Sequence, residues 1–355
     1  MSSSGTSDKT VQDLLIKHRA PLMGIAALWI LLFHTWIPLA GDITGLDYAE
    51  QYLKQIGCAG VDVFFLLSGL GLVRSYNTNG TLKFYYRRFK RLAIPFYISV
   101  ALFLLWDGTF DILTYVKNIS GYSTFFENFF AVTWFVPAIG LMYLLFPVYY
   151  RMMKAMRSPY LFTAFAIVIC ILSITVCEVW GGQFNARILI YRIPAFLIGV
   201  LIGQTVHMKS RPWKVTPFIT VVSVIIFAAS SFVLFATLAG TGILPNAGQN
   251  PALFLSSALL TGMSSVIPVT LLLDRSDRHR VLTFLGTISV ELYCLQEGLF
   301  LRYVKFIGSV CPEYFPLPPL IVIYLVFLIL IVVSSRILNL INTYFWKLIE
   351  KVINH

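Results

Sequence analysis

The sequence predicts an all-α membrane protein, a polytopic bundle of about ten transmembrane helices with both termini in the cytoplasm. Three observations predict this class. Hydrophobic residues make up 58% of the 355 residues and charged residues only 12%, whereas a soluble domain carries roughly 25% charged residues. Apolar runs of bilayer-spanning length recur along the whole chain. Lysine and arginine are concentrated in every second connection between those runs.

Ten apolar runs are long enough to cross a bilayer as helices, since about 20 residues cover the hydrocarbon core. They fall at about 21–40, 57–76, 92–106, 132–150, 160–178, 188–206, 215–238, 252–273, 281–301 and 317–335. Some contain Gly or Pro, which transmembrane helices tolerate. The sequence therefore predicts one transmembrane domain over 21–341, between cytoplasmic tails at 1–20 and 342–355.

The basic residues set the orientation. With the N-terminus in the cytoplasm, every inner segment holds at least three of the 27 Lys and Arg residues, and no outer segment holds more than two. The even number of spans returns the C-terminus to the cytoplasm. We therefore expect a multi-pass protein of the cell (plasma or inner) membrane. The net charge of +11 reflects this topology and indicates no nucleic-acid partner.

Ionisable residues lie inside several of the predicted spans. His34 is about 9 Å below the outer end of the first span, at six residues of helical rise. Asp62 in the second span and Arg192 in the sixth fall at nearly the same depth, and Glu291 in the ninth lies nearer the midplane. Buried membrane charges usually face a bundle interior or a wet cavity. His34, Asp62 and Arg192 share one depth, and this predicts a polar pocket lined by catalytic residues. The alternative is a structural ion pair, such as Asp62 with Arg192.

A basic, aromatic segment, KFYYRRFKRLAIPFY at 83–97, lies on the predicted cytoplasmic side. Arg88 and Arg91 are three residues apart and share a helix face, and arginine forks bind phosphate in a bidentate manner. Arg87 adds charge, and Tyr86 adds a ring that can pack against a flat base. The alternative is a simple anchor at the anionic inner leaflet.

Together, the ionisable residues inside the spans and the basic segment at 83–97 predict a reaction. A phosphorylated donor held at the cytoplasmic mouth would extend a long arm toward His34, and coenzyme A thioesters have this shape. His34 would act as general base on an acceptor hydroxyl, Arg192 would stabilise the oxyanion, and Asp62 would orient the imidazole. The five cysteines lack metal-ligand spacing, so no metal is expected.

Six segments resemble the acyltransferase 3 family of integral membrane O-acyltransferases, and they come in the family's order. They are GIAALWILLFH (24–34), GVDVFFLLSGL (60–70), YYRRFKRLAIPFY (85–97), WFVPAIGLMYLLFP (134–147), YRIPAFLIGVLIG (191–203) and LGTISVELYCLQ (285–296). The resemblance implies acyl transfer from an acyl-coenzyme A, here acetyl-coenzyme A, to a sugar hydroxyl of a cell-surface or exported glycan. It places the family's histidine at His34, its donor-binding arginines at Arg88 and Arg91, and its span-six arginine at Arg192.

The chain departs from the family pattern at three positions. Many members have an arginine where this chain has Met23, and Arg19, one turn earlier, is expected to replace it. Many have a histidine at Gln296 and an acidic residue at Ala195. The full prediction is a catalytic set of His34, Asp62, Arg192 and Glu291 and a donor-binding set of Arg19, Tyr86, Arg87, Arg88 and Arg91.

Two other functions fit the same residues. A proton-coupled transporter of a glycan or lipid-linked sugar would use the membrane-embedded charges as a proton relay. An inactive family member would explain the departures from the pattern. Many transporters have two matching halves, and no such internal symmetry is evident, so the acyltransferase is the preferred prediction. A transporter would keep its activity after loss of Arg88 and Arg91.

Overall fold

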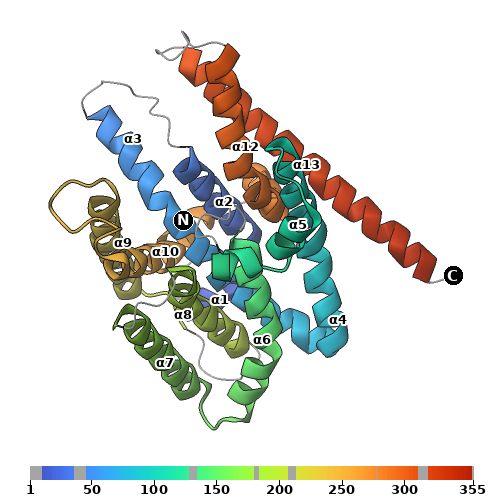
Figure 1. The fold of residues 1–355 in the computed structure, drawn as a ribbon. Helices are drawn as coiled ribbons and strands as arrows, with labels where there is room; N and C mark the ends of the chain where they lie inside the picture. The colour runs from blue at the N-terminus through green and yellow to red at the C-terminus, as the bar shows by residue number, and fades with distance from the viewer. Residues whose placement is uncertain are drawn as a thin grey trace.

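The computed structural model describes residues 10–35, 45–127, 134–179, 184–206, 213–276, 278–310 and 319–353. Within these ranges the regular structure is helical, and the β-type pairing consists of an isolated bridge between Thr10 and Lys214. The helices pack side by side as a bundle (Figure 1). The predicted all-α class is therefore confirmed.

The helices divide the chain much as the apolar runs predict. They are α1 Val11–Lys17, α2 Arg19–His34, α3 Leu46–Gln55, η2 Ile56–Ala59, α4 Gly60–Trp106, α5 Ile112–Ile119, η3 Ser123–Glu127, α6 Phe135–Ala155, α7 Pro159–Val179, α8 Phe184–Thr205, α9 Pro217–Leu238, α10 Pro251–Leu273, α11 Arg280–Thr287, α12 Ser289–Val310 and α13 Pro319–Ile353. Side-chain caps begin several of them. Thr216 caps α9 and Asn250 caps α10, and each is followed by a proline at the first helical position, where the missing N–H costs nothing.

Within the described ranges, seven helices are long and apolar enough to cross a membrane, or nine if each of two bent pairs counts as one span. The bent pairs are α1 with α2, at 71°, and α11 with α12, at 77°. This count treats Leu46–Trp106 as a single helix. The structure is thus that of a multi-span bundle, and the number ten and the orientation of the termini stay predictions.

Helix α4 consists of two arms that meet at Gly80. This residue has φ 70° and ψ 178°, a conformation that glycine adopts without steric cost. Arg88 Nη2 donates a hydrogen bond to Ser75 Oγ at 2.8 Å, although thirteen residues of straight helix would separate the two Cα atoms by about 20 Å. The chain therefore reverses at Gly80, as Figure 1 shows. The two arms contain the predicted spans 57–76 and 92–106.

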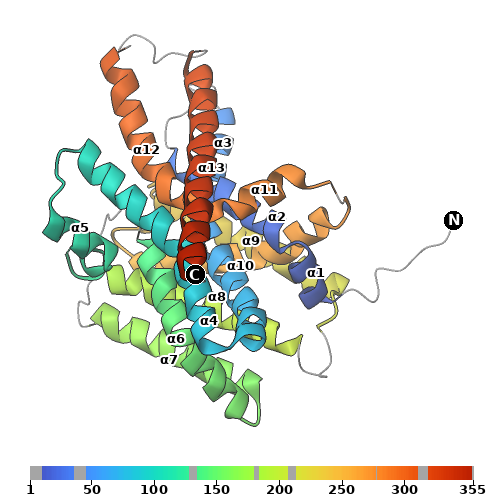
Figure 2. The same cartoon turned by 90° about the vertical axis from the view of Figure 1, so that its right-hand side faces the viewer.

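Three segments differ from the sequence prediction. The expected straight span over 281–301 breaks at Ile288, between α11 and α12. The predicted outer loop after Trp106 folds back beside α4, since Tyr115 Oη of α5 donates to the Tyr97 carbonyl at 3.3 Å. Helix α13 runs without interruption to Ile353, so residues 342–353 continue it (Figure 2).

Small residues let the central helices touch at the backbone. A Cβ built on Gly199 of α8 would lie 2.0 Å from the Leu66 carbonyl oxygen of α4. Close backbone approach at small residues is how membrane helices associate, because lipid offers no hydrophobic contrast between them. This contact brings the first arm of α4 against α8, and these two elements carry Asp62 and Arg192.

We predict that Gly199→Ala destabilises the fold, since the added methyl group meets rigid backbone and must push α4 and α8 apart. Overpacking of this kind typically costs about 1–3 kcal/mol. Gly140→Ala is the matched control, because a Cβ on Gly140 would have no neighbour within 4 Å. Thermal unfolding of the detergent-purified protein compares the two, and an unchanged midpoint for Gly199→Ala would contradict the tight α4–α8 contact.

Candidate functional site

His34 is the last residue of α2, and a carboxylate faces it from α12. Its Nε2 lies 3.7 Å from Glu297 Oε2, which is ion-pair range and longer than a hydrogen bond. The side chains are 16% and 29% exposed, so neither is fully buried. The next residue, Thr35, is held by a 2.8 Å hydrogen bond with Tyr324 Oη. This contact fixes the chain immediately after His34.

Asp62 and Arg192 form a salt bridge between the first arm of α4 and α8. Their side chains are 0% and 4% exposed. The sequence prediction that these two residues share a layer agrees with this contact. The structure pairs the Asp62 carboxylate with Arg192, and the carboxylate that faces His34 is that of Glu297.

Tyr293 of α12 lies in the electrostatic field of both pairs. It is buried, with its ring centroid 4.7 Å from that of Phe135, and both Glu297 and Arg192 act on its hydroxyl electrostatically. One residue from each pair therefore acts on the same buried hydroxyl.

Three arginines converge at the opposite end of α2. Arg19 lies within electrostatic reach of Arg88 and Arg91 and of the Tyr143 hydroxyl. Its guanidinium lies over Gly71, 2.8 Å from where a Cβ would be, and its Nε donates to the Leu67 carbonyl at 3.0 Å. We call Arg19, Arg88, Arg91 and Tyr143 the arginine cluster.

Ring contacts and hydrogen bonds hold Arg88 in the cluster. Its guanidinium lies 5.8 Å from the Tyr143 ring centroid and 5.7 Å from that of Phe84. The Tyr143 hydroxyl is in turn 3.4 Å from Ser68 Oγ. Arg88 Nε is buried and has no hydrogen-bond partner within the described ranges. This N–H remains free to meet a ligand oxygen.

Glu291 contacts the arginine cluster through Arg91, whereas the carboxylate that faces His34 is that of Glu297. Its Oε1 accepts hydrogen bonds from Arg91 Nη1 at 3.0 Å and from Asn339 Nδ2 at 2.8 Å. The expected midplane position assumed a straight span, and the break at Ile288 places Glu291 in the first turn of α12. Arg91 also donates to the Thr287 carbonyl at 2.6 Å, so it anchors the junction between α11 and α12.

Tyr86 and Arg87, two other predicted donor-binding residues, point elsewhere. The Tyr86 hydroxyl donates to Glu350 Oε1 of α13 at 3.1 Å, and its ring lies 5.6 Å from that of Trp346. Arg87 is exposed. The structure thus brings together Arg19, Arg88 and Arg91 from the predicted set and leaves these two outside the cluster.

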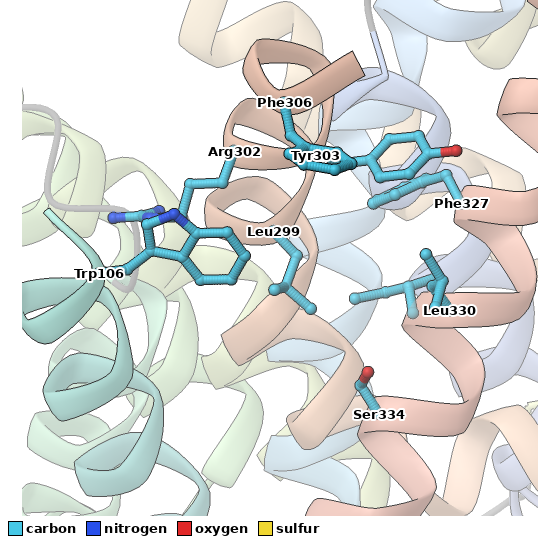
Figure 3. A pocket seen from close by; sticks show the side chains of 9 residues that line it. Trp106, Leu299, Arg302, Tyr303, Phe306, Phe327, Leu330 and Ser334 are labelled. Carbon is cyan, nitrogen blue, oxygen red and sulfur yellow. The ribbon is translucent and has the colours of Figure 1, made fainter. Parts of the chain in front are cut away.

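A separate pocket of about 360 Å³ lies between α12, α13 and the end of α4. Leu299 faces Phe327 and Leu330 across it, and Arg302 extends toward Trp106 (Figure 3). Arg302 is paired with Asp107. None of the sequence-predicted site residues lines this pocket.

The comparisons with known proteins decide the family. A family model described as an acyltransferase domain, of the acyltransferase 3 type, matches residues 22–340. The protein belongs to this acyltransferase family. Comparisons with curated proteins and with solved structures gave no match. The family and the apolar helices together make the chain a multi-pass membrane acyltransferase, as the six resembling segments predicted.

The predicted catalytic and donor-binding sets left out Glu297, Tyr143 and Tyr293. In the sequence, Glu297 lies about two turns beyond Glu291 in the predicted ninth span, but it was given no role because Glu291 was placed at the midplane. Tyr143 and Tyr293 carried no signal, because tyrosine is common in membrane spans. Arg19 does join Arg88 and Arg91, which agrees with its expected replacement of the arginine absent at Met23.

Proposed function

We propose that this acyltransferase moves an acetyl or other short acyl group from a cytoplasmic acyl-coenzyme A to a sugar hydroxyl of a cell-surface or exported glycan. The observation that carries the proposal is the layout of α2. Arg19, in the arginine cluster, and His34 are at opposite ends of this helix, about 22 Å apart at 1.5 Å per residue. A donor with phosphates at one end and a thioester on a long arm matches that separation.

The charge balance of the arginine cluster supports a polyanionic ligand. Arg19 lies within electrostatic reach of Arg88 and of Arg91, and the contact between Arg91 and Glu291 supplies one negative charge. Like charges repel, and a phosphorylated donor would relieve the repulsion while accepting charge-assisted hydrogen bonds. Arg91 already has a carboxylate partner in Glu291, whereas Arg88 and Arg19 donate to neutral oxygens, so Arg88 and Arg19 would make the first contacts and Arg91 would complete the set.

The chemistry at the other end follows from the pairing of His34 with Glu297. The imidazole Nε2 takes the proton of the acceptor hydroxyl as its oxygen attacks the thioester carbonyl. The carbon–sulfur bond then breaks, and the proton on the imidazole passes to the leaving thiolate. Glu297 stabilises the imidazolium that forms between these steps, and it takes the place beside His34 that the sequence prediction gave to Asp62 as the residue that orients the imidazole. The salt bridge with Arg192 supports a structural role for Asp62.

We predict that Arg88→Ala/Arg91→Ala lowers the affinity for acetyl-coenzyme A by about 100-fold or more, since each charge-assisted hydrogen bond is worth about 1.5–3 kcal/mol. Equilibrium binding of radiolabelled acetyl-coenzyme A to the detergent-purified protein measures it. Arg87→Ala is the matched control, because Arg87 is exposed and outside the cluster, and it should bind like the parent.

The same experiment separates the two candidate functions. Binding that needs Arg88 and Arg91, together with slow thioester hydrolysis, supports the enzyme. A parent protein that neither binds nor hydrolyses acetyl-coenzyme A would refute this donor. Other acyl-coenzyme A donors are then tested, and after them glycan transport in proteoliposomes, which is the activity that the transporter hypothesis predicts.

A further inference from the structure

A groove of about 660 Å³ runs between the second arm of α4 and α6. Its lining is mostly apolar, with Leu92, Phe96 and Leu141 among the residues, and it includes Arg88 and Tyr143. Ile119, Ser120 and Phe125 also line it. They do so because α5 and η3 fold back beside the second arm of α4, where Tyr115 donates to the Tyr97 carbonyl.

The groove opens at the outer surface of the helix bundle. Phe89 and Leu144 flank it and are 52% and 59% exposed, and each belongs to a helix that is apolar enough to span a membrane. In a bilayer such exposed apolar side chains contact lipid. A hydrocarbon chain can therefore enter the groove sideways from the bilayer.

The groove crosses the predicted boundary of the membrane. From Arg88 to Tyr97, which also lines it, nine residues of helix rise about 14 Å, and the predicted span 92–106 begins within this stretch, so Arg88 lies at headgroup level and the apolar residues from Leu92 onward lie in the hydrocarbon core. Arg88 lies at the end that the basic-residue pattern assigns to the cytoplasm. Its buried Nε lacks a partner within the described ranges.

We propose that this groove holds one acyl chain of an anionic phospholipid of the inner leaflet, with the lipid phosphate against Arg88. The apolar lining suits a hydrocarbon chain better than the amide-bearing arm of a coenzyme A. The lipid occupies Arg88 when no donor is bound, and the donor displaces its phosphate. This competition, unlike the lipid site itself, rests on the proposed function.

The test uses phosphatidylglycerol with a photoreactive diazirine in one acyl chain, added to the full-length protein in nanodiscs without any acyl-coenzyme A. Irradiation should label peptides that contain Leu92, Phe96 and Leu141. Gly140→Phe should abolish this labelling, because Gly140 lines the groove and a Cβ there meets nothing within 4 Å. Leu145→Phe is the control. Leu145 is 50% exposed on α6 outside the groove lining, and this variant should be labelled like the parent.

A second probe, a diacylglycerol with the same photoreactive chain but no phosphate, tests the contact with Arg88. It should label the groove more weakly than phosphatidylglycerol. Equal labelling by both probes would overturn the phosphate contact, and labelling of Gly140→Phe equal to the parent would overturn the groove site. If Gly140→Phe does not fold, Gly140→Leu replaces it. A labelled groove in a protein that binds no acyl-coenzyme A would refute the proposed donor while leaving the lipid site intact.

Discussion

His34→Ala should lose acyl transfer and thioester hydrolysis while keeping the parent's affinity for acetyl-coenzyme A. A general base contributes about 100- to 10,000-fold to the rate, and His34 is about 22 Å from the arginine cluster along α2, so the phosphate contacts remain. Hydrolysis of radiolabelled acetyl-coenzyme A measures the rate, and equilibrium binding measures the affinity. A variant that still hydrolyses at the parent rate would remove His34 from the reaction.

Glu297→Gln separates the role of this carboxylate from general damage to the site. The amide keeps the shape of the side chain and removes its charge, so the imidazolium loses its nearest carboxylate at 3.7 Å. We expect a lower hydrolysis rate, unchanged donor affinity and an unchanged unfolding midpoint. Gln296→Leu is the neighbouring control. Gln296 is buried beside Glu297 in sequence, but its loss removes no charge.

The second large effect is a loss of stability, expected when the Asp62–Arg192 salt bridge is broken. Arg192→Met should destabilise the protein by about 3–5 kcal/mol, because it leaves a carboxylate uncompensated in a fully buried position. Asp62→Leu/Arg192→Met replaces both charges by apolar groups, and the unfolding midpoint should return close to the parent value. Chemical or thermal unfolding in detergent measures both.

The acyl-transfer activity of Asp62→Leu/Arg192→Met decides between a catalytic and a purely structural role for the pair, which the sequence left open. If Asp62→Leu/Arg192→Met is both stable and active, the pair is structural. If it is stable but inactive, the pair acts in the reaction, through Arg192 as an oxyanion-stabilising group or through Asp62 as the residue that orients the imidazole. A double variant as unstable as Arg192→Met would contradict the salt bridge as the reason for the loss of stability.

The sequence by itself determined the fold class and the family, and it supplied the candidate residues at the two ends of the proposed site. Apolar runs of spanning length and few charges leave a helical membrane bundle as the consistent class, because backbone groups in lipid must be satisfied within each helix. His34 could be named as a candidate catalytic residue from the sequence, because an ionisable group in an apolar span is costly and rare. Arg88 and Arg91 could be named as candidate donor-binding residues, because their spacing places them on one helix face.

Only the tertiary structure decided which charges face each other. Depth estimates assume straight helices, so they placed Glu291 at the midplane. The break at Ile288 moves it to Arg91 and leaves Glu297 for His34. Depth also says nothing about rotation around a helix axis, and this rotation, fixed by backbone contacts such as Gly199 with Leu66, pairs Asp62 with Arg192. The fold-back of α5 beside α4 supplies part of the groove lining, and no pattern in the loop sequence indicated it, because tertiary packing overrides local signals there.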